Sequence, residues 1–212
     1  EFRPVSSFFG EEVSEEDAKN GKEPQAVYYV SDENKQAQYI KMFRDAGLDA
    51  IYCDTYIDPH FLSYLEYKNP TRVRFLRIDA DVAGALKEEG GEDEDLKKVF
   101  EKALEGKRVT VRTEKFKDAS VPAVVNVSEF VRRMSEMHSF YGMGDSPVDV
   151  TLVVNASNPA VLALKDAEEG EQTKAAEQIY YLALMNYRPL TPEELTAFVS
   201  TSTLLLEKYL KK

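Results

Sequence analysis

The last forty or so residues constrain the fold most strongly, because they contain two consecutive helix-forming segments with apolar faces. Residues 172–187 carry a broad apolar surface that extends beyond one helix face, so this segment needs partners on two sides. In the second segment the spacings of three and four are those of one helix face, formed by Leu195, Phe198, Val199, Ser202, Leu205, Leu206, Tyr209 and Leu210. Such a helix is not stable alone in water, so it must pack against something.

The turn between these segments carries clear helix-start signals. Thr191 is expected to be the N-cap, Pro192 the first helical residue and Glu194 the third, which together form a capping box. The pattern predicts an antiparallel helical hairpin, which is half of a four-helix bundle. Two arrangements stay open at this point: the hairpin packs onto its own chain, or two copies meet in an isologous dimer.

Composition limits the classes of protein that this chain can belong to. With 212 residues, 43% of them hydrophobic and 31% charged, the chain is expected to form one large or two small globular domains. A net charge of −11 argues against a nucleic-acid partner, because phosphate binding requires clustered Lys and Arg. Apolar runs are too short for a membrane span, and a secretory signal is not visible. The start at Glu1, without Met, favours the cut end of a longer protein, although processing leaves the same trace.

Cysteine usage points to a reducing compartment. The single cysteine, Cys53, excludes an internal disulfide and favours a cytoplasmic protein. Because Cys53 lies in an apolar run, we interpret it as a small buried hydrophobe and not as a nucleophile.

The rest of the sequence predicts two modules after an acidic, flexible lead-in at residues 1–25. Residues 26–106 are expected to form a small α/β subdomain with a βαβ unit; its strands are placed at 26–30, 49–53 and 73–78, and its helices at 34–46, 58–66 and 95–104. Residues 107–212 are expected to form a mixed domain with strands at 108–114, 121–127 and 151–155; the segment 121–127 is more uniformly apolar than 108–114, so it should be a more central strand. The fold class is therefore α/β plus α+β, with a C-terminal hairpin that forms a dimeric four-helix bundle.

The sequence offers little support for catalysis. The turn after the first strand, residues 31–34, is acidic and lacks glycine, which argues against a phosphate cradle. His60 and His138 lie on different predicted helices without metal-ligand spacing, and no calcium-loop pattern surrounds Asp79 and Asp81. We expect no catalytic, cofactor or metal site. The alternative of a small α/β enzyme or nucleotide-binding module, with C-terminal helices covering its sheet, stays open.

A methionine-rich segment stands out instead. Residues 128–138 predict a helix with Val131, Met134 and Met137 on one face, while Arg132 and Arg133 lie off it. Flexible thioethers adapt to partners of many shapes, as promiscuous binding surfaces require. The alternative interpretation is that this apolar face belongs to the protein's own core.

Several blocks, taken in order, carry a family resemblance from Ala26 to the end of the chain. They are AVYYVSDENKQ at 26–36, IDPHF at 57–61, VPAVV at 121–125, LVVN at 152–155 and QIYYLAL at 178–184. Together they resemble the end of the middle region and the C-terminal dimerisation domain of the 90-kilodalton heat-shock chaperones. The chain ends in Lys211-Lys212 and not in the acidic pentapeptide of cytosolic eukaryotic members, which favours the bacterial or organellar branch.

The resemblance implies an ATP-driven, homodimeric chaperone that clamps partly folded client proteins. The family's ATP site, with its Mg²⁺, lies in an N-terminal domain absent from these residues, so no catalytic or cofactor-binding residue transfers. The implied dimer interface comprises Ile179, Leu182, Leu195, Phe198, Ser202, Leu205, Leu206 and Tyr209. The implied client-contact residues are Val131, Met134, Met137, Phe140, Tyr141 and Met143. A purely structural dimerisation module without client contact is a further alternative.

Overall fold

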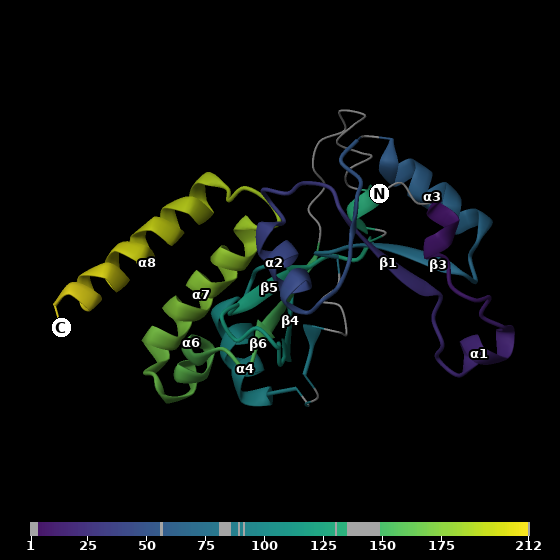
Figure 1. Cartoon of the computed structure of the whole chain (residues 1–212). Coiled ribbons are helices and arrows are strands. Elements are labelled where there is room, and N and C mark those ends of the chain that lie inside the picture. The colour runs from purple at the N-terminus through teal and green to yellow at the C-terminus, as the bar shows by residue number, and fades with distance from the viewer. Residues whose placement is uncertain are drawn as a thin grey trace. The chain divides into compact units, whose positions relative to one another are not determined.

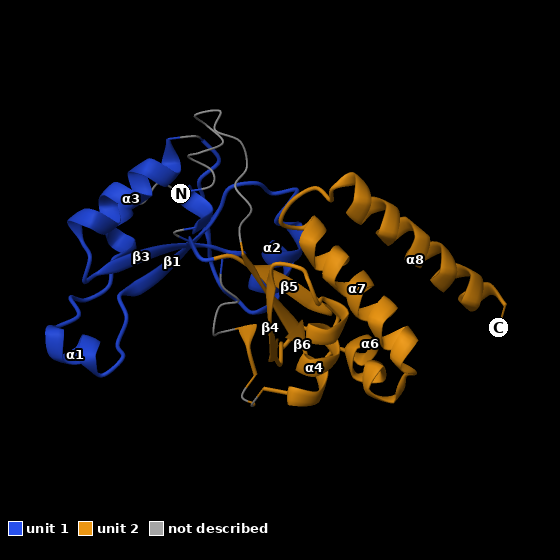
Figure 2. Cartoon of the chain, turned by 180° about the vertical axis from the view of Figure 1, so that it is seen from behind, with its two compact units in different colours: residues 1–81, 128–144 blue, residues 82–127, 145–212 orange. Residues whose placement is uncertain are grey.

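A computed structural model describes residues 4–55, 57–80, 86–88, 90, 92–129, 131–134 and 149–211. The chain divides into two compact units, which Figure 2 colours separately. Unit 1 comprises residues 1–81 and 128–144, and unit 2 comprises residues 82–127 and 145–212. The chain therefore passes between the units three times, and each unit is built from segments that are not contiguous in sequence.

Unit 1 is built on a parallel three-stranded sheet with the strand order β2-β1-β3 (Figure 1). The central strand β1 (Gln25–Val30) is followed by α2 (Ala37–Asp45) and the short strand β2 (Ile51–Tyr52). Helix α3 (Asp58–Lys68) then leads to β3 (Val73–Arg77), which pairs with β1 from the other side. The predicted βαβ unit is confirmed, and β3 is an edge strand of the described sheet.

The two faces of this sheet are covered by different helices. Because side chains alternate along β1, Tyr28 and Tyr29 lie on opposite faces of the sheet. The Tyr28 ring packs edge-on against Phe43 of α2, with ring centroids 4.9 Å apart. On the other face Tyr29 is buried in a cluster with Phe75 of β3 and Leu62 of α3. Alternation along one strand thus supplies apolar contacts to both covering helices.

The lead-in at residues 1–25 differs from the flexible segment that its composition predicts. A 3-10 helix, η1 (Val5–Phe8), places Val5, Phe8 and Phe9 against the unit 1 core cluster. The backbone N–H of Val13 donates to the carbonyl of Thr71, and the Val13 side chain is buried. A second short helix, α1 (Glu15–Lys19), then precedes β1. A few apolar side chains in an otherwise acidic segment suffice to hold its first part against unit 1.

Unit 2 contains a mixed three-stranded sheet and two long helices. Strands β4 (Val109–Glu114) and β6 (Val150–Asn155) run parallel, while β5 (Ala123–Asn126) pairs with β6 in the antiparallel sense. The sheet order is β4-β6-β5, so β6 is central and both β4 and β5 lie at an edge; the prediction that residues 121–127 form a more central strand than 108–114 is therefore wrong. Helix α7 (Glu169–Met185) packs over β5, where Ala123 and Val125 belong to the same buried cluster as residues of this helix.

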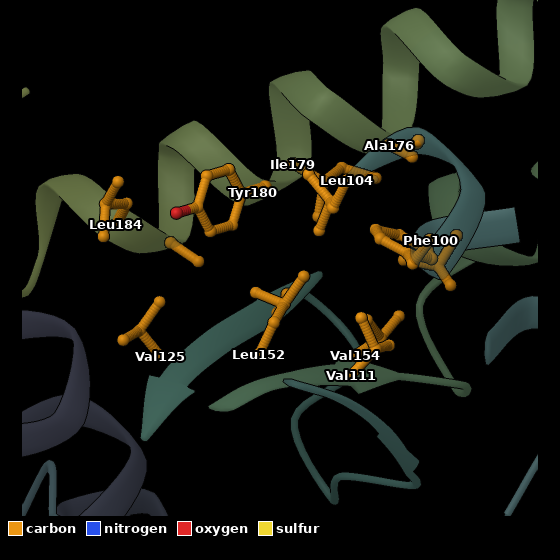
Figure 3. Close-up of a cluster of buried hydrophobic side chains, with 14 of the residues drawn as sticks. Phe100, Leu104, Val111, Val125, Leu152, Val154, Ala176, Ile179, Tyr180 and Leu184 are labelled. Carbon is orange, nitrogen blue, oxygen red and sulfur yellow. The ribbon is translucent and has the colours of Figure 1, made fainter. Parts of the chain in front are cut away.

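The core of unit 2 lies between this sheet and helices α4 (Glu94–Ala103) and α7, as Figure 3 shows. Phe100 of α4 lies over Val154 of β6, Tyr180 of α7 lies near Leu152 of β6, and Leu184 of α7 lies over Val125 of β5. Helix α4 packs on β4 and α7, so it belongs to unit 2. The boundary between the two units therefore lies before α4, and not near residue 106 as the sequence predicts.

The chain reaches the C-terminal hairpin through α6 (Pro159–Leu162) and the 3-10 helix η3 (Ala163–Asp166). After α7, helix α8 (Pro192–Leu210) begins with the predicted capping box, in which Thr191 accepts from the Glu194 N–H and Glu194 accepts from the Thr191 N–H. The hairpin, its turn and its capping chemistry are therefore as the sequence predicts.

Candidate functional site

Helix α8 has a long apolar stripe that its own chain leaves uncovered. No residue of α8 is buried in the part of the chain that the structure describes. Leu195, Val199, Ser202, Leu206 and Tyr209 follow spacings of four, three, four and three, which is the heptad seam of a coiled coil. Leu206 is 61% exposed and Tyr209 is 78% exposed. These five residues, called here the α8 seam, form a mostly apolar stripe in which Ser202 is half-buried against α7 and the other four are exposed.

The other residues expected at the dimer interface divide into two groups. Ile179 is buried in the unit 2 core and Phe198 packs against that core half-buried, so both serve the chain's own packing. Leu182 of α7 and Leu205 of α8 are 43% and 44% exposed, so both are accessible in the single chain. The sequence alone cannot make this distinction, because all four residues carry the same apolar period.

Polar contacts fix the hairpin that presents the α8 seam. Within the hairpin the Gln178 amide donates to the Ser202 hydroxyl at 2.8 Å, while the buried Gln178 Oε1 has no partner among the described residues. Arg188 forms a bidentate ion pair with Glu194, in which its two terminal guanidinium nitrogens donate to the two carboxylate oxygens at 2.7 and 2.8 Å. Lys208 of α8 pairs with Glu171 at the start of α7. The two helices therefore present the seam from a defined hairpin geometry.

The predicted client-contact segment has an unexpected polarity. Its backbone is helical at Glu129 and at residues 131–134, where Val131 is 36% exposed and Met134 is half-buried. Arg132 is buried instead, with only 3% of its side chain exposed. In this turn, therefore, the charged Arg132 is buried and the apolar Val131 is exposed to solvent. Four other predicted client-contact residues lie outside the described residues: Met137, Phe140, Tyr141 and Met143.

Glu129 is at the centre of the charged contacts that dock this turn onto unit 1. It accepts a hydrogen bond from the Tyr29 hydroxyl at 2.7 Å and from Arg133 Nε at 2.7 Å. Arg132 donates to both Glu129 and the Tyr29 hydroxyl. Arg133 also pairs with Glu66 of α3 at 2.6 Å. Sequence reasoning missed this cluster, although the spacing of Glu129, Arg132 and Arg133 by three and four residues is that of helical ion pairs.

The cluster changes the acidity of its members. Burial by itself raises the pKa of Glu129, but the neighbouring Arg132 and Arg133 and the Tyr29 hydroxyl outweigh it, so this pKa lies below its ordinary value of 4.5. Burial raises the pKa of Tyr29, and the Glu129 carboxylate adds to this effect against the opposing charge of Arg132. Glu129 is therefore an anion and Tyr29 a neutral donor at neutral pH.

Stability should therefore depend on pH through Glu129. A carboxyl group whose folded-state pKa is lowered stabilises the protein fully above its unfolded pKa, and this contribution is lost as the pH falls through the folded pKa. We expect the difference in the free energy of unfolding between the wild-type chain and Glu129→Gln to be constant above about pH 5 and to shrink below it. Urea denaturation across pH 3 to 7 measures this, with about 0.5 M urea steps. A difference that does not vary over this range would contradict the assignment.

The carboxyl end of β1, where a dinucleotide-binding fold holds phosphate, is already occupied by the chain's own side chains. The buried Gln36 side chain accepts hydrogen bonds from the N–H groups of Ser31 and Asp32, at 2.8 and 3.0 Å. Asp32 accepts from the N–H groups of Asn34 and Lys35, at 3.0 and 3.1 Å. Since these four amides already have acceptors and a carboxylate stands among them, the loop does not fit a phosphate group.

Other candidate reactive groups are also placed in structural roles. The thiol of Cys53 is buried in the unit 1 core, where burial first and the nearby Asp58 and Asp54 second raise its pKa to about 11. Asp79 is buried and pairs with Arg77. The described residues contain no group of three or more His, Cys, Asp or Glu side chains placed to hold a metal ion. His138 and Asp81 lie outside them.

In the described part of the chain, none of the helices combines the length and the apolar character needed to cross a bilayer. Helix α8, whose apolar side chains are exposed, also carries charged and hydroxyl side chains on another side.

These observations define the chain as a mixed α/β protein with exposed apolar side chains and a helical hairpin at residues 169–210. No protein-family model matches it. Chaperone protein HtpG of Porphyromonas gingivalis is 32% identical over 165 residues, which are 69% of this chain and 24% of that protein. The HtpG of Bacteroides thetaiotaomicron is 30% identical over 172 residues, and that of Bacteroides fragilis is 29% identical over 178.

The chain belongs to the HtpG family of chaperones, a bacterial branch of the 90-kilodalton heat-shock proteins. The matches with the Bacteroides proteins cover 72% and 75% of this chain, and 25% and 26% of those proteins. The chain thus spans about a quarter of the length of the relatives it matches. The resemblance inferred from the sequence blocks is confirmed.

Proposed function

We propose that this chain provides homodimerisation and client contact to an HtpG-type chaperone that assists protein folding. The single observation that carries the proposal is the α8 seam, a heptad of mostly apolar side chains with no buried residue on its helix. An exposed apolar surface of this kind marks an interaction site. A second copy of the chain is the partner that a heptad seam on a helical hairpin fits best.

The proposed interface is isologous. Two hairpins pack around a two-fold axis into a four-helix bundle, with each α8 seam against the hairpin of the partner subunit. Leu182 and Leu205 widen the contact beside the seam. A stable dimer of this kind buries on the order of 1,200 to 2,000 Å² in total. Ile179 and Phe198 support the interface from within unit 2 and do not contact the partner.

Client contact is proposed for the apolar side of the helix that the sequence predicts over residues 128–138. Its support is the inverted polarity of the described turn, where Arg132 is buried and Val131 is exposed. If the apolar side were core, burial would follow the opposite order. Met134 lies three residues after Val131 and so on the same helix side, where a flexible thioether can adapt to varied client surfaces.

The proposed mechanism couples the two surfaces through the dimer. Constitutive association at the hairpin holds two client-binding arms at high effective concentration, so that clamping of one client becomes intramolecular. In this proposal the chain itself binds no cofactor, and ATP with Mg²⁺ binds elsewhere in the whole protein. The free, buried Cys53 agrees with a cytoplasmic location. A partner of nucleic-acid or membrane type is not expected, given the net charge of −11.

The solution mass of the chain tests the proposal directly. Light scattering across a dilution series should give about twice the 24.0 kDa of one chain, and this mass should persist on dilution to low micromolar concentration. A mass of one chain at every concentration would contradict the assignment of the α8 seam as a dimer interface.

A further inference from the structure

We propose that Glu129 and Arg133, together with Glu66, form an ionic latch that mounts the client-contact helix on unit 1. Glu129 accepts a hydrogen bond from the Arg77 N–H of β3, and Arg133 donates one to the Phe75 carbonyl of the same strand. The latch concerns how the proposed client surface is held in place, so its functional part rests on the function proposed above. The positions of its side chains do not depend on that function.

The latch occupies the open edge of the unit 1 sheet. Strand β3 pairs only with β1 among the described strands, so its outer backbone groups need other partners. The N–H of Phe75 donates to Glu66 at 2.6 Å, and the carbonyl of Phe75 accepts from Arg133 at 3.1 Å. The N–H of Arg77 donates to Glu129 at 3.3 Å. Side chains of α3 and of the latch segment therefore stand where a fourth strand would pair.

Arg133 connects the parts of the latch. Besides Phe75, its guanidinium contacts Ser63 at 2.9 Å, Glu66 at 2.6 Å and Glu129 at 2.7 Å. Its five donors in a planar fork suit such divergent acceptors, which a lysine ammonium cannot match. Only 16% of the Arg133 side chain is exposed, compared with 11% for Glu129 and 24% for Glu66.

The charges of the latch balance once the neighbouring Arg132, which contacts Glu129, is counted with Arg133 against Glu129 and Glu66. A balanced buried cluster is tolerated, but removal of one member leaves an uncompensated buried charge. In contrast, Val131 and Met134 do not belong to the buried clusters described around Phe100 and around Tyr29. The contacts described for this turn are ion pairs and hydrogen bonds, so we expect the turn to open without disrupting those two clusters.

Opening has two consequences at once. It frees the helix that carries Val131 and Met134 from the surface that orients it. It also leaves the Phe75 carbonyl and the Arg77 N–H without their side-chain partners, so the β3 edge becomes able to pair with an extended backbone. A closed latch thus positions the client surface and protects the sheet edge with the same side chains.

Hydrogen exchange of the 212-residue chain tests the latch. Arg133→Met keeps a long apolar stem but removes every donor of the latch arginine. We expect amide exchange in residues 128–134 and at Arg77 to accelerate by at least about tenfold, with exchange in residues 149–211 unchanged. Arg74→Met is the matched control, because Arg74 lies on the same strand and pairs with Glu23 at 3.2 Å in an exposed ion pair. This control should exchange like the wild-type chain.

Two further variants keep the test decisive if Arg133→Met disturbs folding. Glu66→Gln should give a smaller acceleration confined to the same residues, and its combination with Arg133→Met should be clearly non-additive. Arg133→Lys should fail to restore wild-type exchange, because it lacks the planar fork. Wild-type exchange in Arg133→Met, or equal acceleration in both units, would overturn the latch.

A client assay separates the latch from the proposed function. Arg133→Met should weaken suppression of client aggregation several-fold while its solution mass stays that of the wild-type chain. Unchanged suppression in a variant with accelerated exchange would overturn the positioning role. If the wild-type chain does not suppress aggregation at all, the proposed client function fails, and the exchange rates alone decide whether the latch exists.

Discussion

The Leu206→Asp variant is expected to be a monomer of 24.0 kDa under conditions in which the wild-type chain is a dimer. Leu206 lies in the middle of the α8 seam and is 61% exposed in the single chain, so the substitution leaves the fold of one chain intact. In the dimer it removes two apolar side chains and places two unpaired carboxylates in an apolar contact. The combined cost is about 5 kcal/mol or more, which weakens association by at least about a thousandfold.

Ser200→Asp is the matched control for this variant. Ser200 lies on the polar side of α8, together with Glu193 and Glu207 at spacings of seven residues, so an added carboxylate remains in water. The control should keep the wild-type mass and the wild-type melting temperature. If Leu206→Asp also keeps the wild-type mass, the α8 seam is not the dimer interface, whatever the cause of association.

The Val131→Ser/Met134→Ser variant is expected to lose most of the affinity of the chain for unfolded clients. Each substitution removes an apolar side chain that the proposal places against the client, at about 1.5 to 3 kcal/mol for a side chain that becomes fully buried. Since client contact is partial and adaptable, the loss for the pair should be about ten- to a hundredfold in affinity. Fluorescence anisotropy with a labelled unfolded protein measures this loss.

The melting temperature separates client contact from core packing in the same variant. Val131 is exposed and Met134 half-buried, so the free energy of unfolding should change by less than about 1 kcal/mol. Leu162→Ser, at an exposed apolar residue of α6, is the control and should leave client affinity unchanged. A large loss of stability in Val131→Ser/Met134→Ser would show that these residues belong to the core. Unchanged affinity would favour the purely structural dimerisation module instead.

Much of the fold is predictable from local sequence signals. The capping box at Thr191 and Glu194 is defined by side chains within one helical turn, and the structure contains it. Gly47 and Gly106 follow helices α2 and α4 with φ values of 69° and 82°, a left-handed conformation that glycine adopts without strain. Such features depend on residues that are close in the chain, so a single sequence is sufficient to find them.

The charged cluster around Glu129 shows where sequence reasoning stops. Arg132 and Arg133 lie off the apolar face of the predicted helix, a position that normally implies contact with water. Their burial depends on Glu66 and Tyr29, which are 67 and 103 residues away in sequence from the arginines that contact them. No periodicity within the helix can reveal partners at that distance.

The sequence by itself determined the helical hairpin, the βαβ unit, the family and the existence of an apolar seam on α8, because each follows from local periodicity, capping or recognisable blocks. Only the tertiary structure decided that β6 is the central strand, that Ile179 belongs to the core and that Arg132, on the charged side of its turn, is buried. The physical reason is the same in each case. Burial and strand order are set by contacts between segments that are far apart in the chain. The spacing of apolar residues within one helix or strand shows that a face needs a partner, but it does not identify that partner.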